Sequence, residues 1–223
     1  MEKNKTPFKA ADYDKNVRRV IPFYDTIYEQ ITGLISVYFG GRSISLLDTG
    51  CGSGNMGAQA LEKLNVSELV LCDPSEAMLS ITRERFGDRA EYRCIGSEQL
   101  DHEERFDVVT AIQSHHYYSD KSLRELAVKN CFRALKKGGL FICFENTAPF
   151  TVQGKDILLR RIEDFGLKAG RTPDEVKAHS ARYDTEYFPI TIAEHLELLE
   201  NTGFSCAELF WASYMQCGFY AIK

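Results

Sequence analysis

The segment LLDTGCGSG, residues 46–54, constrains the fold of this chain more than any other feature. A short apolar run precedes it and a helix-like stretch follows it. Gly50 and Gly52 leave out side chains where a backbone must bend sharply and approach a ligand. The helix start behind these glycines offers unpaired N–H groups. Such a strand–loop–helix unit predicts an α/β fold with a ligand at the end of the strand.

An acid stands directly before the glycines. Asp48 ends the strand, where a carboxylate would repel the pyrophosphate that a dinucleotide enzyme binds at this position. The same carboxylate suits a cationic ligand, such as the ammonium or sulfonium group of S-adenosylmethionine. A glycine loop alone is weak evidence, so the acid decides between the two ligands.

Strand-like and helix-like segments alternate along most of the chain. This order requires a mostly parallel sheet with helices on both faces. The last two strand-like segments have too short a gap for a helical crossover, so they should pair antiparallel, with a turn close to Ala212 and Ser213. The expected strands are Ser43–Asp48, Glu68–Cys72, Ala90–Ile95, Phe106–Ile112, Leu140–Glu145, Phe204–Phe210 and Met215–Ile222, and the expected helices between them are Gly54–Leu64, 75–86, Ser119–Leu135 and Thr191–Asn201.

Two further regions are helical in pattern. Residues 13–39 are rich in aromatics and have a helical period, with a break near Pro22. The strand–helix alternation stops at Asn146, and the stretch to Pro189 contains two helix-like segments, the second opened by Pro173. We therefore expect an N-terminal helical lid in residues 1–42, a Rossmann-like domain in residues 43–223 and an insertion at about 147–190.

Composition limits the domain organisation, localisation and binding partners of the chain. The chain has 223 residues, a net charge of −5 and 44% hydrophobic residues, which suits one α/β domain with a lid. The chain has no apolar run long enough for a membrane span, and residues 1–5 are polar, so we predict a cytoplasmic protein. The mild acidity gives no strong nucleic-acid signal. The seven scattered cysteines have no metal-finger spacing, so we expect buried thiols and no metal.

Two more polar positions lie at strand ends. Asp73 ends the second strand about twenty residues past the glycines, where a carboxylate can accept both ribose hydroxyls, although Asp-Pro-Ser is also an ordinary turn. Ser97 and Glu98 follow the third strand, where a side chain can reach an adenine edge. A simple helix cap explains them equally well, and the sequence does not choose between the two residues.

Together with FDVVTAIQSHHY, the LKKGG turn and the closing hairpin, this combination resembles the class I methyltransferases. The resemblance runs from about Leu46 to Lys223. It implies that the acid and the loop hold the methionine part of S-adenosylmethionine, that Asp73 holds the ribose, and that the residues after the fourth strand line the floor near the methyl group. The cofactor positions implied are Asp48, Gly50, Cys51, Gly52, Asp73, Pro74, Met78, Ser97, Glu98, Gln113 and Ser114.

A narrower likeness lies in the opening YDKNVRRVIPFYDTIY and the ending HLELLENTGFSCAELFWASYMQCGFYAIK. Both look similar to the carboxy-S-adenosylmethionine synthases of tRNA wobble-uridine modification and to related methyltransferases. In those synthases an arginine before the hairpin holds the extra carboxylate of the cofactor. Leu198 aligns with that arginine, and a leucine cannot hold a carboxylate. We therefore expect ordinary methyl transfer.

The catalytic and substrate positions are less constrained. Methyl transfer from a sulfonium needs in-line positioning more than acid–base help. His115 and His116 follow the fourth strand, where one could act as a general base, although such a pair also packs or hydrogen-bonds the loop. The expected substrate positions are Tyr13, Tyr24 and Tyr117, with Arg182 and Tyr183 of the insertion for an anionic acceptor.

The predicted function is methyl transfer from S-adenosylmethionine to a small molecule or a tRNA base, leaving S-adenosylhomocysteine, in a protein that could form a homodimer. Three alternatives remain open at this point. They are a carboxy-S-adenosylmethionine synthase-like enzyme, a non-catalytic S-adenosylmethionine-binding protein, and a nicotinamide oxidoreductase, against which the acid before the glycines argues.

Overall fold

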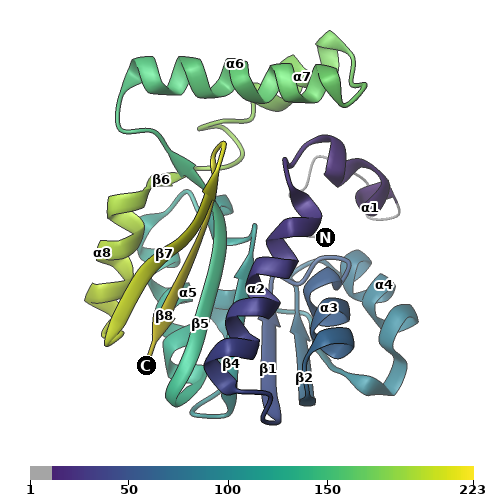
Figure 1. Ribbon diagram of the computed structural model, residues 1–223, viewed down its shortest axis with the longest axis vertical. Coiled ribbons are helices and arrows are strands. Elements are labelled where there is room, and N and C mark those ends of the chain that lie inside the picture. Colours follow the sequence, from purple (N-terminus) through teal and green to yellow (C-terminus); the bar gives the residue numbers. More distant parts are fainter. Residues whose placement is uncertain (1–11) are drawn as a thin grey trace.

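A computed structural model describes residues 12–223 as a three-layer α/β protein (Figure 1). Seven strands form one continuous sheet in the order β3-β2-β1-β4-β5-β8-β7, and a short β6 pairs with β5. The expected mostly parallel seven-stranded sheet is thus confirmed. The strands are β1 (Ile44–Thr49), β2 (Val66–Cys72), β3 (Glu91–Arg93), β4 (Phe106–Ile112), β5 (Leu135–Ala148), β6 (Ile190–Thr191), β7 (Cys206–Ser213) and β8 (Gln216–Ile222).

The first five strands pair in parallel, and the last two close the sheet as an antiparallel hairpin. β1 is buried along its whole length, as expected for a central strand with a helix layer on each side. Its two neighbours, β2 and β4, lead to opposite sides of the sheet. The carboxyl ends of β1 and β4 therefore meet at a topological switch point, where open α/β sheets bind their ligands.

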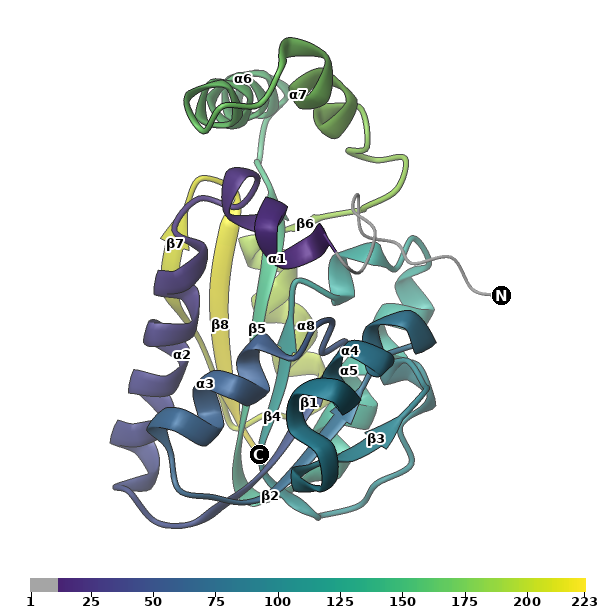
Figure 2. The ribbon, with the colours of Figure 1, turned by 90° about the vertical axis from the view of Figure 1, so that its right-hand side faces the viewer.

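Two apolar clusters cover the two faces of the sheet. On one face, Ile31 of α2 and Met56 of α3 pack over Leu46 and Leu71. On the other face, the side chains of α5 and α8 pack over alternate residues of the same strands. Figure 2 shows the two helix layers on either side of the sheet. The helices are α2 (Tyr24–Phe39), α3 (Asn55–Lys63) and α4 (Glu76–Phe86) on the first face, and α5 (Lys121–Ala134) and α8 (Ile192–Thr202) on the second.

The N-terminal segment is broken into short pieces. A helix α1 (Tyr13–Asn16) and a 3-10 turn η2 (Val17–Arg19) precede α2, and Phe23 adopts a left-handed φ of 57° at the start of α2. The break expected near Pro22 is therefore present. The first eleven residues of the expected lid lie outside the described residues.

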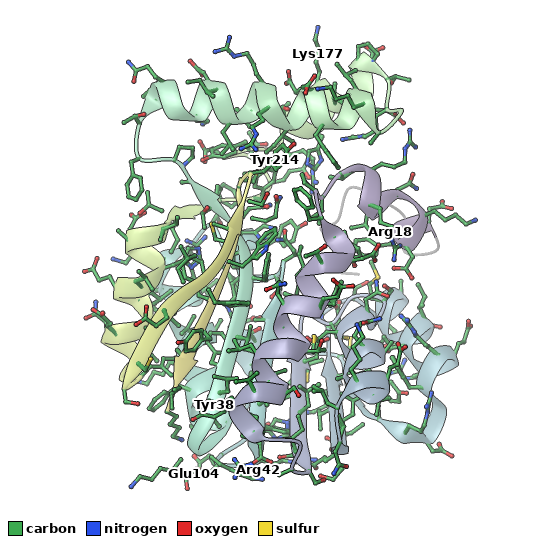
Figure 3. All side chains as sticks on the ribbon, viewed as in Figure 1. Arg18, Tyr38, Arg42, Glu104, Lys177 and Tyr214 are labelled. Atoms are coloured by element: carbon green, nitrogen blue, oxygen red, sulfur yellow. The ribbon has the colours of Figure 1, made fainter. Side chains whose placement is uncertain are left out.

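The helical insertion lies over the carboxyl edge of the sheet (Figure 1). It consists of α6 (Val152–Lys168) and α7 (Pro173–Ser180), and Pro173 opens α7 as the sequence predicts. The tip of the β7–β8 hairpin reaches this insertion, and Figure 3 labels Tyr214 at the contact. The guanidinium of Arg161 lies 4.0 Å from the Tyr214 ring centroid, and the Phe165 ring lies 5.8 Å away.

Three local expectations were wrong. The hairpin turns at Tyr214 and Met215, two residues later than expected, because Tyr214 takes the left-handed φ of 54° that the turn needs. β5 begins at Leu135, so the two glycines lie in an irregular part of the strand and do not end the preceding helix. The two-residue β6 was not foreseen. Within residues 12–223, no helix is both long and apolar enough to cross a membrane.

Candidate functional site

The larger cavity of the protein lies at the carboxyl ends of β1, β2 and β4, beneath α1. Every residue that the sequence assigned to the cofactor lines it, together with Tyr13, Tyr24 and Tyr117. The other described residues that line it are Tyr28, Ser53, Asn55, Met56, Ser75, Gly96, Ile112 and Tyr118.

The glycine loop follows β1 with three left-handed residues in five positions. At Gly52, φ is +54° and a β-carbon would meet nothing within 4 Å, so the backbone there borders open space. At Gly50, with φ of +68°, a β-carbon would lie 2.5 Å from the β-carbon of Ser114. A residue without a side chain is thus needed at the two positions for different reasons. One allows the loop to approach β4, and the other leaves room for a ligand.

Asp48 is buried at the end of β1. Its carboxylate accepts a hydrogen bond from the Thr110 hydroxyl at 2.7 Å. Burial raises the pKa of Asp48 to about 7, the Thr110 hydrogen bond lowers it, and the nearby Asp73 carboxylate raises it further. A carboxylate held this way gains much from a cation placed against it, because the charged form is otherwise poorly solvated.

Asp73 is held by the backbone on both of its oxygens. The Gly52 N–H donates to one oxygen at 2.9 Å, and the Ser75 N–H donates to the other at 2.8 Å. Burial nevertheless raises the pKa of Asp73. Each carboxylate oxygen can accept a second hydrogen bond, so the group keeps acceptor capacity toward the cavity. Asp73 thus makes the turn that the Asp-Pro-Ser segment predicts, and its carboxylate also lines the larger cavity.

The structure separates the roles of Ser97 and Glu98 at the end of β3. The Ser97 hydroxyl is buried and shared between the Thr49 hydroxyl at 2.8 Å and the His115 Nε2 at 2.9 Å. Glu98 accepts a hydrogen bond from the Tyr118 hydroxyl and lines the cavity. Of the two side chains, Glu98 is therefore the better placed for an adenine edge.

Gln113 and Ser114 follow β4 and form the floor of the cavity. Gln113 has a left-handed φ of 54°, and its N–H donates to the Phe144 carbonyl at 2.6 Å. The Gln113 Nε2 and the Ser114 hydroxyl are buried and have no hydrogen-bond partner among the described residues. Strained backbone and unpartnered polar atoms at one place are features of a site that a ligand completes.

Charge distinguishes this cavity. Three carboxylates line it, those of Asp48, Asp73 and Glu98. No Lys, Arg or His stands among the described lining residues. The cavity therefore suits a ligand with a positive charge and several hydroxyl or amine groups, and it is unsuited to a phosphate.

The N-terminal segment rests on the glycine loop as a roof. Asp14 accepts hydrogen bonds from the Ser53 hydroxyl at 2.8 Å and from the Asn55 amide at 2.7 Å. The Tyr24 hydroxyl accepts from the Asn55 amide at 3.0 Å. These contacts tie α1 and α2 to the start of α3. They were not foreseen, because nothing in the sequence places Asp14 next to residues forty positions away.

A smaller cavity adjoins the first beneath the insertion. The two share Tyr13, Gln113 and Tyr117, so Gln113 reaches both. Three buried side-chain atoms without a hydrogen-bond partner among residues 12–223 belong to its lining, namely Gln113 Nε2, His179 Nδ1 and Gln216 Oε1. The other described lining residues are Val17, Val20, Ile21, His116, Asn146, Ile162, Arg182, Tyr187 and Met215.

The two histidines have different surroundings. His115 is buried, is absent from the described lining of both cavities and contacts the Ser97 hydroxyl. Burial lowers the pKa of His115 to about 4. His116 lines the smaller cavity, and its Nδ1 lies 2.6 Å from the Glu145 Oε2. The geometry thus does not support His115 as a base, and only His116 keeps access to a cavity.

The two expected substrate residues of the insertion, Arg182 and Tyr183, also differ in their surroundings. Arg182 lines the smaller cavity and donates to Glu186 at 2.7 Å. Tyr183 is buried in an apolar cluster with Ile162 and Tyr187, and the Lys155 ammonium lies 4.1 Å from its ring centroid. Tyr183 therefore packs the insertion and is not in the described lining of either cavity.

Comparison with known proteins gives a family match and relatives over most of the chain. Residues 46–139 match the family described as the methyltransferase domain. A carboxy-S-adenosyl-L-methionine synthase from Staphylococcus epidermidis is 25% identical over 96% of this chain and 93% of its own length. One from Sulfurimonas denitrificans is 26% identical over 96% of this chain and 92% of its own length.

Solved structures have the same fold. A 1,6-didemethyltoxoflavin-N1-methyltransferase from Burkholderia thailandensis aligns with a TM-score of 0.60 over 96% of this chain and 86% of its own, at 17% identity. A candidate S-adenosylmethionine-dependent methyltransferase from Methanococcus maripaludis aligns with a TM-score of 0.65 over 99% and 96% of the two chains, at 16% identity. The chain is a class I S-adenosylmethionine-dependent methyltransferase, related to the carboxy-S-adenosylmethionine synthases.

Leu198 and Glu145 lie in different surroundings. Leu198, which aligns with the synthase arginine, packs against the apolar cluster of α5 and α8 and is not in the described lining of either cavity. Its identity alone therefore does not decide which cofactor is used. Glu145 is fully buried next to His116. It was not selected from the sequence, because its only distinguishing feature there is that an acid ends the fifth strand.

Proposed function

We propose that this methyltransferase binds S-adenosylmethionine in the larger cavity and methylates a small molecule held in the smaller cavity. The observation that carries the cofactor assignment is the charge of the larger cavity, with three carboxylates and no cation among its described lining residues. S-adenosylmethionine supplies a methyl group on a positively charged sulfur that leaves as a neutral thioether. Asp48 would face the positive charge, Asp73 the ribose hydroxyls and Glu98 the adenine.

Water would be excluded from the reacting groups by Asp14, Asn55 and the tyrosines of the N-terminal segment that line the larger cavity, Tyr13, Tyr24 and Tyr28. Pro74 and Met78 line the same cavity and would pack against the nucleoside. An acceptor in the smaller cavity would lie next to Gln113 and Tyr117, which border both cavities. Because this space is enclosed by α1, η2 and the insertion, it favours a small molecule over a tRNA base. S-adenosylhomocysteine would be the product left in the larger cavity.

Calorimetry with S-adenosylmethionine, S-adenosylhomocysteine and NADH tests the cofactor assignment. We expect both adenosyl compounds to bind and NADH not to bind, since its pyrophosphate would meet the Asp48 carboxylate. Binding of NADH with an affinity equal to that of the adenosyl compounds would contradict the proposal. Turnover with an acceptor panel then separates an enzyme from a non-catalytic binding protein.

The relatives favour a second candidate, a carboxy-S-adenosylmethionine synthase-like activity. Synthases match over nearly the whole chain, and Arg182 places a guanidinium in the cavity next to the cofactor. Mass spectrometry of the nucleoside bound after expression separates the candidates. We expect S-adenosylmethionine or S-adenosylhomocysteine. A species heavier than S-adenosylmethionine by one carboxylate, less a proton, would favour the synthase.

Localisation and assembly stay predictions. All seven cysteines are free, and most are buried, which suits a reducing compartment such as the cytoplasm. Fractionation of the producing cell tests this expectation. Light scattering on the purified protein tests for the homodimer.

A further inference from the structure

We infer that His116 is the general base of this methyltransferase, that Glu145 is its positioning residue, and that the acceptor therefore carries a weakly acidic O–H or N–H group. This inference rests on the proposed function, because it places the acceptor in the smaller cavity. It adds the chemical class of the acceptor and two residue roles.

Glu145 is surrounded by donors from a single turn. Its Oε1 accepts from the His115 N–H at 3.0 Å, and its Oε2 accepts from the His116 N–H at 3.1 Å and from the His116 ring at 2.6 Å. The carboxylate is fully buried. Burial alone would raise its pKa, but the hydrogen bond and the charge of His116 lower the pKa of Glu145 to about 2. Glu145 is thus ionised over the working pH range.

This arrangement selects one tautomer of His116. An ionised carboxylate only accepts hydrogen bonds, so the His116 Nδ1 carries the proton that Glu145 receives. In the neutral ring the Nε2 then has the lone pair. None of the described residues hydrogen-bonds this Nε2, and His116 lines the smaller cavity. The lone pair is available to a proton from a bound acceptor.

The lining of the smaller cavity calls for a polar ligand. Gln113 Nε2, His179 Nδ1 and Gln216 Oε1 are buried without a partner among the described residues. Leaving such atoms unpaired destabilises the folded state, so a ligand or ordered water is expected to complete them. Arg182 is the one residue with a permanent positive charge among the described lining residues, and its Nε donates to Glu186, which lies outside the described lining, at 2.7 Å. A guanidinium at this place stabilises an acceptor as it loses its proton.

The proposed step combines proton transfer to His116 with methyl transfer to the acceptor. The acceptor O–H or N–H gives its proton to His116 Nε2, and the freed electron pair forms the bond to the methyl carbon. The carbon–sulfur bond breaks, and its electrons stay on the sulfur of S-adenosylhomocysteine. His116 becomes an imidazolium beside the Glu145 carboxylate and later releases the proton to water.

Several charged or titratable groups face this pair, and they enter any pH profile. Burial lowers the pKa of His195 to about 4 and that of His179 to about 3, so both stay neutral near pH 7. Geometry distinguishes His116 from these rings, because it lines the smaller cavity and its Nδ1 lies against the buried Glu145 carboxylate. The full set comprises His115 and Tyr117 of the turn η5 (His115–Tyr117), Arg124 of α5, His195 of α8, and His179, Arg182 and Tyr187 of the insertion.

A chromogenic phenol tests the inference without knowledge of the natural acceptor. The protein is saturated with S-adenosylhomocysteine, confirmed by calorimetry, and titrated with 4-nitrophenol at a pH where the free phenol is protonated. We expect bound 4-nitrophenol to show the phenolate absorbance band, because His116 takes its proton. His116→Gln should lose this band, and His102→Gln, at a half-buried histidine outside the described lining of both cavities, should keep it.

Nitrogen NMR of the histidine rings tests the positioning role directly. In the wild-type protein we expect His116 to carry its proton on Nδ1, with an unprotonated Nε2. Glu145→Gln should shift the ring toward the other tautomer, because an amide can donate to Nδ1, and Glu145→Asp should keep the original one. With any acceptor that turns over, His116→Gln should lower kcat by about 10²- to 10⁴-fold with little change in the KM for S-adenosylmethionine.

The outcomes separate two failures. If S-adenosylhomocysteine does not bind, the proposed function itself is wrong. If it binds but 4-nitrophenol does not, or binds without ionising, or ionises equally in His116→Gln, the inference is overturned while the cofactor site stands. A proton on His116 Nε2 in the wild-type protein would also overturn it.

Discussion

The two cavities of this methyltransferase adjoin each other but differ in charge. The larger one has three carboxylates and no cation among its described lining residues, whereas the described lining of the smaller one includes Arg182 and no carboxylate. Gln113 and Tyr117 border both. The contrast matches a reaction between a positively charged donor and an acceptor that becomes an anion, each held by residues of opposite charge.

The two cavities also differ in how they are built. The larger one is formed mainly by loops that directly follow parallel strands, whose positions the sheet determines. The smaller one lies between strand ends and α1, η2 and the insertion, elements that meet only through tertiary contacts. The Arg19 guanidinium, for example, donates to the Ala169 carbonyl at 3.1 Å and joins η2 to the end of α6. A change in the loops should therefore affect cofactor binding, and a change in the insertion should affect the acceptor.

The largest effect is expected at Gly52. In Gly52→Val a branched side chain would enter the open space of the larger cavity, so S-adenosylmethionine binding should fall by more than 100-fold as measured by calorimetry. Gly40→Val is the matched control, since Gly40 has a φ of +59°, borders open space and lies outside the described lining of both cavities. Both variants bear the same backbone strain. Equal affinity in the two variants would show that the loop does not contact the cofactor.

Asp73→Ala should have the next largest effect. Loss of charged hydrogen bonds to the ribose should weaken S-adenosylhomocysteine binding by about 1.5–3 kcal/mol, or roughly 10- to 150-fold. The variant should also lose stability, because the Gly52 and Ser75 N–H groups lose their acceptor. Binding is therefore measured on protein that circular dichroism shows to be folded. Wild-type affinity in folded Asp73→Ala would refute the ribose assignment.

The charge contrast predicts a pH dependence of cofactor binding. Burial raises the pKa of Asp48 to about 7, and a bound cation should lower it again. The affinity for S-adenosylmethionine should then rise with pH up to about 7 and level off above it, by at most about tenfold per pH unit. S-adenosylhomocysteine keeps its ammonium group but lacks the sulfonium charge, so its affinity should depend less on pH. An equally steep pH dependence in Asp48→Asn would exclude this carboxylate as the cause.

The smallest expected effect concerns stability in acid. The pKa values of His115 and His195 are lowered to about 4, so the unfolded state binds more protons and stability falls as pH drops from 6.5 toward 4. Glu145, with its pKa lowered to about 2, extends the loss below pH 4.5. The raised pKa of Asp48 acts in the opposite direction between pH 3.8 and 7.

Urea unfolding over this pH range measures the balance. Each group contributes at most about 1.4 kcal/mol per pH unit to the change in the free energy of unfolding. Asp48→Asn removes the opposing contribution, so the acid loss should become steeper. A shallower loss in that variant would show that Asp48 does not oppose the loss of stability in acid.

Much of the larger cavity was predictable because local sequence determines it. A glycine loop between a strand and a helix has few conformations, and parallel strands bring their carboxyl ends to one edge. All eleven cofactor candidates accordingly line one cavity, although their roles stay proposals. The choice between Ser97 and Glu98 was not predictable, because it depends on the Thr49 and His115 side chains that share the Ser97 hydroxyl.

The sequence by itself determined the mostly parallel character of the sheet, the antiparallel hairpin and the two helical segments after the fifth strand, because hydrophobic period, glycines and short gaps act over neighbouring residues. Only the tertiary structure decided which of two adjacent histidines reaches a cavity, which partner Glu145 takes and where Leu198 packs. These outcomes depend on contacts such as that of His116 with Glu145, twenty-nine residues apart. A buried carboxylate is stable only where donors converge on it, and that convergence is a property of the folded chain.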